Sequence, residues 1–150
     1  MPVISSPVKQ LDPYEFGRRL IESNDIDPVY VLLYQAGLER LQLQRWLLAY
    51  WCYYHVGTAS WIVDQPAYWA AMGQAAASKD WPRSSERRHF RGQNAIKSVA
   101  WLHNHGIDEL FGPLISRSPV PLKQIMDYVR TWVGFGPWIA FKVADMLERL

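Results

Sequence analysis

The feature that most constrains the fold is the segment from Leu38 to Val56, which has the longest helical periodicity in the chain. Its first half is amphipathic, whereas its second half, Trp46 to Val56, is apolar on nearly every side. A helix that is apolar all round must be covered by other elements. We therefore predict one helix over residues 38–56 at the centre of the domain, with Cys52 in the core and His55 in its last turn.

The other periodic segments also favour helices, because none alternates apolar and polar residues with the period of two typical of a strand. We expect an all-α chain whose 150 residues form a single compact helical domain, with residues 1–11 as a loose N-terminal arm. Further helices are expected over residues 13–23, 29–36, 58–63, 66–77, 93–103, 122–131 and 138–150. Residues 107–121 are expected to form a loop. In the 93–103 helix, one face is expected to hold Ile96, Val99, Ala100 and His103.

The composition excludes several kinds of site. A single cysteine, Cys52, rules out an internal disulfide and any zinc or iron–sulfur cluster built on several thiolates. The net charge of +2 does not by itself indicate a nucleic-acid partner. Because the chain has no leader sequence and no apolar run long enough to cross a bilayer, we expect a soluble intracellular protein without a membrane partner.

Positive charge is concentrated in one segment. Residues 81–97 have a net charge of +4, whereas the rest of the chain has −2. Arginine presents a planar fork of donors that matches phosphate oxygens two at a time. The basic side chains of this segment are Arg83, Arg87, Arg88, Arg91 and Lys97, with Glu86 and His89 among them. The cluster predicts a site for a phosphate-rich ligand, and the alternative is an ordinary solvated helix face.

Residues 133–137, Val-Gly-Phe-Gly-Pro, lie between two helical segments and resemble the helix-hairpin-helix of DNA glycosylases. Gly134 and Gly136 would let backbone amides approach a DNA phosphate, and the following helix adds its positive N-terminal end. Lys142 stands near the place of the lysine that follows such hairpins, and residues 122–150 would form the unit. The alternative is a tight turn between helices. The aspartate that glycosylases need beyond the hairpin has no counterpart, because Asp145 is too close, so base excision is disfavoured.

Three stretches together resemble the alpha-glutamyl/putrescinyl thymine pyrophosphorylase family, also called the amino acid:DNA transferases of bacteriophages. They are Trp51–Ser60, Trp81–Gly92 and Gly134–Met146, and the resemblance covers most of the chain from about residue 28. It implies that an amine, such as an amino acid or a polyamine, displaces phosphate or pyrophosphate from phosphorylated 5-hydroxymethyluracil in phage DNA. It also implies action in the cytoplasm of the infected bacterium.

The residues of the basic segment suit that reaction. Four arginines would bind the anionic leaving group and stabilise its charge, namely Arg83, Arg87, Arg88 and Arg91. The incoming amine must lose a proton, and the candidate bases are His89, Glu86 and His55. Direct displacement and loss of phosphate before amine addition both remain open.

The target base would have to leave the DNA stack to be modified. Aromatic side chains that could stack on it are Trp51, Tyr54, Trp81 and Trp138, although each also suits the core. An activated leaving group makes a cofactor unnecessary. A magnesium ion that assists the phosphate stays an alternative, but no carboxylate cluster requires one.

Three functions follow from these features. The first is the transferase, for which Arg87→Ala and His89→Ala are expected to abolish transfer and leave the fold intact. The second is a non-catalytic helix-hairpin-helix module that binds DNA with a steep salt dependence. The third is a base-excision glycosylase, which the missing aspartate disfavours.

Overall fold

The structure, a computed structural model, describes residues 29, 33, 36–115 and 120–149. The loose arm expected over residues 1–11 and the helix expected over 13–23 lie outside the described residues. So does most of the helix expected over 29–36, from which Val29 and Leu33 are described and contribute to the core.

The described part of the chain contains helices and turns but no strand, which confirms the all-α prediction. In chain order, the elements are α4 (Arg40–Tyr53), α5 (Val56–Asp64), α6 (Tyr68–Ala77), the 3-10 turn η1 (Ser85–Arg87), α7 (Gly92–His105), α8 (Ile107–Phe111), the 3-10 turn η2 (Gly112–Leu114), α9 (Leu122–Val129) and α10 (Pro137–Arg149). No helix in the described part has both the length and the apolar character needed to span a membrane.

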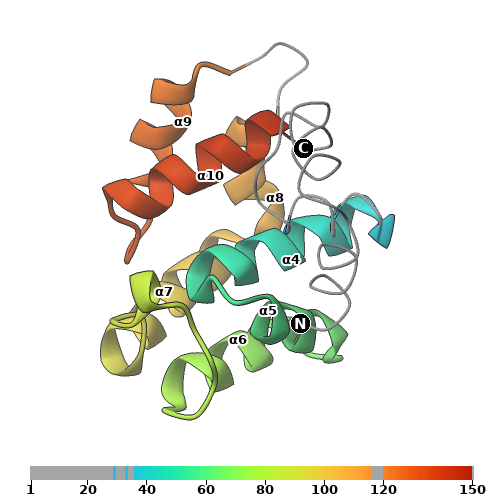
Figure 1. The fold of residues 1–150 in the computed structure, drawn as a ribbon, viewed down its shortest axis with the longest axis vertical. Helices are drawn as coiled ribbons and strands as arrows, with labels where there is room; N and C mark the ends of the chain where they lie inside the picture. The colour runs from blue at the N-terminus through green and yellow to red at the C-terminus, as the bar shows by residue number, and fades with distance from the viewer. Residues whose placement is uncertain (1–28, 30–32, 34–35, 116–119, 150) are drawn as a thin grey trace, which may run out of the picture.

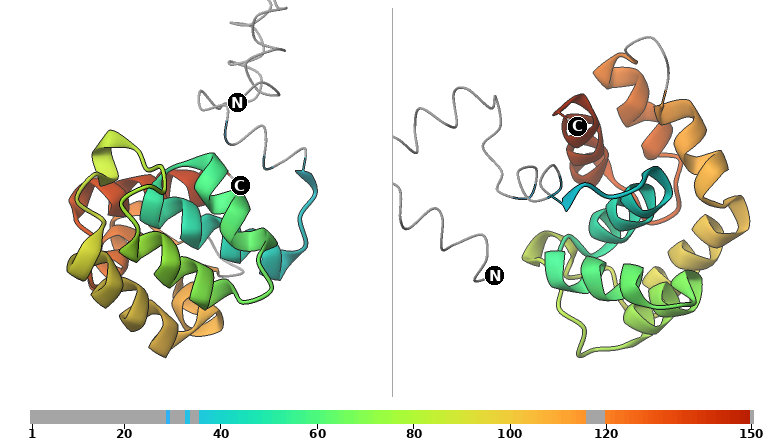
Figure 2. Two further views of the ribbon diagram at one scale, coloured as in Figure 1. Left: turned by 90° about the horizontal axis from the view of Figure 1, so that it is seen from below. Right: turned by 90° about the vertical axis from the view of Figure 1, so that its right-hand side faces the viewer.

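Helix α4 runs through the middle of the fold, with α9 and α10 on one side and α5 and α6 on the other (Figures 1 and 2). Every residue from Trp46 to Tyr53 is buried, including Cys52, as the apolar pattern predicted. Trp51 stacks on Phe111 with ring centroids 5.5 Å apart, and its Nε1 donates to the sulfur of Met146 at 3.3 Å. The central helix therefore links α8 to α10 through its own side chains.

The prediction of one helix over residues 38–56 is wrong at its carboxyl end. Helix α4 stops at Tyr53, and Tyr54 adopts a left-handed conformation with φ 49°. His55 then caps a new helix, α5, by accepting the backbone N–H of Thr58 on Nδ1 at 3.2 Å. His55 is therefore the N-cap of α5 and not a residue of the last turn of α4.

The loop expected over residues 107–121 is also partly wrong, because α8 and η2 occupy its first half. Ile107, Leu110 and Phe111 have helical spacing and are buried. Asp108 and Glu109 lie in the first turn of α8, where negative charge is favoured by the helix dipole. Short elements of this kind depend on burial against α4 rather than on their own length.

The core face of α7 differs from the predicted one. Its buried residues are Ala95, Ser98, Val99 and Leu102. Ile96, which was expected on this face, is 38% exposed. The reason is the turn before α10, which packs so closely on α7 that small side chains must face it. A Cβ added to Gly134 would lie 2.8 Å from the Ser98 hydroxyl oxygen.

Helices α9 and α10 pack together, and residues 130–136 connect them. The connection is anchored by Trp132 and Phe135, which are 1% and 5% exposed. Gly134 has φ +86°, so a glycine is required there, whereas Gly136 has no such conformation and open space around it. The two helices and their turn are thus observed, while a DNA-binding role for this hairpin stays a prediction.

Candidate functional site

The basic segment lies against the carboxyl end of α4, and Arg87 is its deepest arginine, only 8% exposed. Its Nε donates to the carbonyl of Cys52 at 2.8 Å, and its Nη1 donates to the carbonyl of Gly134 at 3.2 Å. The last carbonyls of a helix lack partners within the helix, and the helix dipole favours a cation there. Arg87 therefore joins the end of α4 to the turn before α10.

The Arg87 guanidinium has one atom, Nη2, that takes no part in these hydrogen bonds. Its Cζ lies 4.5 Å and 5.1 Å from the ring centroids of Phe90 and Phe135. Its Nη2 is buried and has no hydrogen-bond partner among the described residues. Burial lowers the pKa of this guanidinium, but arginine keeps its charge at neutral pH. A buried charged donor without an acceptor is costly. Because Nη2 has less than 1 Å² of exposed surface, no anion contacts it from solvent in this arrangement.

Arg83, in contrast, is occupied by the backbone of its own loop. Its Nε donates to the carbonyl of Trp81 at 3.3 Å, and its Nη2 donates to the carbonyls of Ala75 and Ser78, each at 3.0 Å. Its Nη1 donates to the carbonyl of Phe90. These bonds satisfy the carboxyl end of α6 and close the loop between α6 and α7. Arg83 therefore holds the fold, which corrects the phosphate-binding role expected from the sequence.

Arg88 and Arg91 are the two arginines of the segment that face solvent. Arg88 donates one hydrogen bond to the carbonyl of Ser85 at 2.8 Å, and Arg91 donates one to the carbonyl of Arg88 at 3.0 Å. Each bond uses a single N–H group of a guanidinium that carries five. Both side chains are thus oriented by the turn and keep most of their donors for a ligand.

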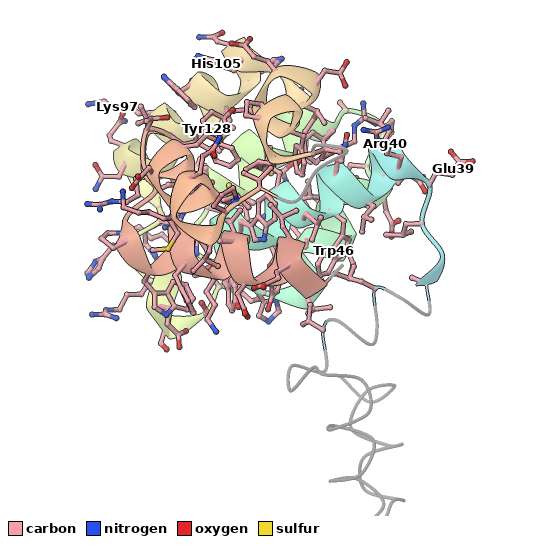
Figure 3. All side chains as sticks on the ribbon, turned by 90° about the horizontal axis from the view of Figure 1, so that it is seen from above. Glu39, Arg40, Trp46, Lys97, His105 and Tyr128 are labelled. Atoms are coloured by element: carbon pink, nitrogen blue, oxygen red, sulfur yellow. The ribbon has the colours of Figure 1, made fainter. Side chains whose placement is uncertain are left out.

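The basic segment and the turn before α10 meet at a cavity of about 310 Å³. Its lining residues are Glu86, Arg87, His89, Phe90, Asn94, Lys97, Val133 and Gly134. The Ser98 hydroxyl donates to the carbonyl of Val133 at 2.5 Å and fixes the hairpin side of this cavity. Figure 3 shows Lys97 at the end of the molecule opposite to Glu39 and Arg40. The structure therefore brings the two features chosen from the sequence into one site.

Glu86 lines this cavity, and the charge of Lys142 on α10 acts on its carboxyl. The backbone N–H of Glu86 itself, the hydroxyls of Ser84 and Ser85 and the nearby charge of Lys142 lower the pKa of the Glu86 carboxyl. Glu86 is therefore ionised at neutral pH but is a weaker base than an ordinary glutamate. Lys142 also lies over the ring of Trp138, with Nζ 6.0 Å from the ring centroid.

His55 lies outside the cavity lining, and its ring is used by the fold. Because Nδ1 accepts the backbone N–H of Thr58, the proton of the neutral ring belongs on Nε2. Burial lowers the pKa of His55, which favours this neutral form. The Thr58 hydroxyl in turn donates to the carbonyl of Pro82 at 2.6 Å, so the cap also supports the basic segment. We correct His55 from a candidate base to a capping residue.

The predicted stacking residues separate into buried and partly exposed rings. Trp51 has no exposed surface, so it cannot stack on a base, and that prediction is wrong. Trp81 is half-buried and packs on Trp61 with ring centroids 4.0 Å apart. Tyr54 is half-buried beneath Trp138, edge to face at 5.0 Å. Trp138 itself is 38% exposed and remains the most accessible of these rings.

The sequence interpretation missed Asn94 and Val133 as cavity residues, and counted Lys97 only as a charge. Asn94 and Lys97 are three residues apart on α7 and therefore share a face. The signal available was this polar spacing directly after the arginines. Among the described residues, no group of three His, Cys, Asp or Glu side chains is placed to hold a metal ion.

Comparison with known proteins gives matches along nearly the whole chain. A family model described as amino acid:DNA transferase matches residues 9–150. A glycinyltransferase of Pseudomonas phage PaMx11 is 35% identical over an alignment of 158 residues, which covers 98% of this chain and 54% of that protein. A putrescinyltransferase of Delftia phage PhiW-14 is 25% identical over 142 residues, covering 84% of this chain and 41% of that protein. The chain thus spans about half the length of the curated relatives it matches.

Proposed function

Because the chain belongs to the amino acid:DNA transferase family, we propose that it joins an amine to a thymine-derived base in phage DNA. The family match confirms the resemblance predicted from the sequence. In the proposed reaction, the amine nitrogen bonds to the methylene carbon of phosphorylated 5-hydroxymethyluracil. The carbon–oxygen bond breaks, phosphate or pyrophosphate leaves, and the amine gives up one proton. The names of the two phage relatives support an amino acid or a polyamine as the donor.

The observation that carries this proposal is the meeting of the basic segment and the hairpin at one cavity. Arg88 and Arg91 lie outside the cavity lining but on the same turn, and they keep donors free for the leaving anion. Lys97 adds charge at the cavity, so the site can stabilise the negative charge that develops on the leaving group.

His89 is the base that we assign to the incoming amine. It lines the cavity and is exposed, so a bound amine can reach it. Glu86 lines the same cavity, but its lowered pKa makes it a weaker base, and we assign it to the electrostatics of the site. The hairpin amides near Gly134 and Gly136 and the amine of Lys142 would bind the phosphates of the DNA backbone.

A transfer assay tests the reaction. DNA containing 5-phosphomethyluracil or 5-pyrophosphomethyluracil is mixed with the protein and a panel of amino acids and polyamines, and the digested nucleosides are read by mass spectrometry. A nucleoside with the mass of one added amine is expected with at least one donor. No product with any donor, together with salt-dependent DNA binding, would instead indicate the non-catalytic module. Release of free base would indicate the glycosylase.

Variants at exposed positions test the roles without disturbing the core. His89→Ala is expected to reduce transfer strongly, whereas His103→Ala, an exposed histidine of α7 outside the cavity, is expected to leave it unchanged. Arg88→Ala combined with Arg91→Ala is expected to weaken use of the phosphorylated substrate, with Arg40→Ala at the other end of the molecule as the control (Figure 3). The phage origin of the relatives supports the cytoplasm of an infected bacterium as the place of the reaction.

A further inference from the structure

Helix α10 presents two aromatic side chains to solvent, although most of its apolar residues are buried. Trp138 and Phe141 are 38% and 43% exposed, whereas Ile139, Ala140 and Val143 are at most 2% exposed. Residues three apart on a helix lie on the same face. The outer face of α10 near its N-terminus therefore carries two exposed aromatic side chains, which are candidates for contact with a ligand.

The Trp138 ring is held in place from below. It meets the ring of Tyr54 edge to face, with centroids 5.0 Å apart. Tyr54 packs on Tyr50 at 4.4 Å, and Tyr50 stacks on Trp46 at 5.0 Å. A row of aromatic rings thus leads from the core of α4 to the surface of α10. A ring supported in this way loses little conformational entropy when it contacts a ligand.

The hairpin and Lys142 relate this aromatic face to the proposed site. Val133, which is 41% exposed, lines the cavity beside the hairpin. On the other side, Lys142 lies over the Trp138 ring and is close enough to Glu86 of the cavity to lower the pKa of its carboxyl. The cation of Lys142 next to the exposed Trp138 ring matches a nucleic acid, which offers phosphates and base faces together. An apolar protein partner would not need this charge.

We infer that Trp138 and Phe141 fill the place that the target base leaves in the DNA stack when it is flipped into the cavity. The inference rests on the proposed function, because only a base that reacts in the cavity has to leave the duplex. A cavity of about 310 Å³ takes a single base with its substituent and not a duplex. Apolar side chains inserted between base steps open the stack in other DNA-bending proteins.

The first experiment compares transfer activity on double-stranded and single-stranded DNA. Trp138→Ala, Phe141→Ala and the double variant are assayed on the phosphorylated base in a matched duplex and in single-stranded DNA. Stacking on an aromatic ring predicts that activity on the duplex falls about 10- to 100-fold, while activity on the single strand falls less than about 3-fold. An equal loss on both DNA forms, or no loss on either, would overturn the inference. Leu41→Ala is the matched control, because Leu41 is 46% exposed and lies near the start of α4, away from the hairpin (Figure 1).

The second experiment needs no chemistry, so it separates this inference from the proposed function. A duplex with 2-aminopurine next to the target position is titrated with protein, and its fluorescence reports unstacking. The wild-type chain and Leu41→Ala are expected to raise the signal, whereas Phe141→Ser is expected to bind without raising it. Should the wild type raise no signal, or Phe141→Ser raise it fully, the two rings do not open the stack. A change of oligomeric state in the variants with unchanged fluorescence would assign the face to a protein contact instead.

Discussion

Arg87→Ala is expected to destabilise the fold, in contrast to the expectation from the sequence that this substitution leaves it intact. The hydrogen bond from Nε to the buried carbonyl of Cys52 is charge-assisted and contributes about 1.5–3 kcal/mol. Contacts with the rings of Phe90 and Phe135 contribute about 0.5–2 kcal/mol in total. In the variant, water can replace Nη1 as the partner of the exposed Gly134 carbonyl. Removal of the unpartnered Nη2 is favourable, so we expect the free energy of unfolding to fall by about 3 kcal/mol in total.

Urea unfolding followed by tryptophan fluorescence measures this loss, because the chain contains 8 tryptophans. A loss of about 3 kcal/mol corresponds to a fall in Tm of about 6–12 °C for a domain of this size. Arg88→Ala is the matched control, and its exposed side chain predicts a change within about 0.5 kcal/mol. If Arg87→Ala unfolds within 1 kcal/mol of the wild type with the same urea dependence, the structural role of Arg87 is refuted.

Three other predictions concern the surroundings of the site. Gly134→Ala is expected to lower the free energy of unfolding by about 2–5 kcal/mol, because of the positive φ and the contact with Ser98. Gly136→Ala should unfold like the wild type, because Gly136 has open space around it. Burial lowers the pKa of His55 in the folded state, so the unfolded chain takes up the proton first as the pH falls below about 6.5. The contribution of His55 to stability is therefore present above that pH and is lost below it. His55→Asn, which can still cap, should lose less stability than the wild type between pH 7.5 and pH 5.5 in urea unfolding. Burial raises the pKa of the Cys52 thiol to about 12, so a thiol reagent should modify it only after denaturation, and rapid labelling of the native protein would contradict its position in the core.

The fold was most predictable where one strong pattern decided the structure. The apolar surface of residues 46–53 left no arrangement except a covered helix, and that helix is the centre of the domain. The predicted ranges 93–103 and 138–150 lie within two residues of α7 and α10, which end before Gly106 and begin at Pro137. In each case the information was local to the chain.

The break between α4 and α5 could not be predicted in the same way. Tyr54 takes a left-handed conformation that a non-glycine residue rarely adopts, and no glycine or proline stands at that position to indicate it. The conformation is stabilised by contacts from distant residues, such as the edge-to-face packing with Trp138. Pattern reasoning has no access to such contacts, so His55 was placed on the wrong helix.

The arginine cluster of residues 81–97 likewise has one property that the sequence predicted and one that it could not predict. Its charge and composition predicted an anion site, but the direction of each side chain depends on which carbonyls lie nearby. Arg83 meets carbonyls at the end of α6 and Arg87 meets one at the end of α4, so these two hold the turn together. Arg88 and Arg91 find only local partners and stay exposed.

This division determines how mutational data on the basic segment should be interpreted. Removal of Arg83 or Arg87 would shift the backbone that carries His89 and Arg88, so activity would fall even if neither arginine touched the substrate. Loss of activity alone therefore cannot separate a ligand contact from support of the turn. Only a variant that keeps the wild-type free energy of unfolding and loses transfer identifies a side chain that meets the substrate. By that criterion Arg88, Arg91 and His89, which are exposed at the turn, are the informative positions. Replacement of Arg87 with lysine is not informative, because lysine cannot keep both hydrogen bonds and the ring contacts of the guanidinium.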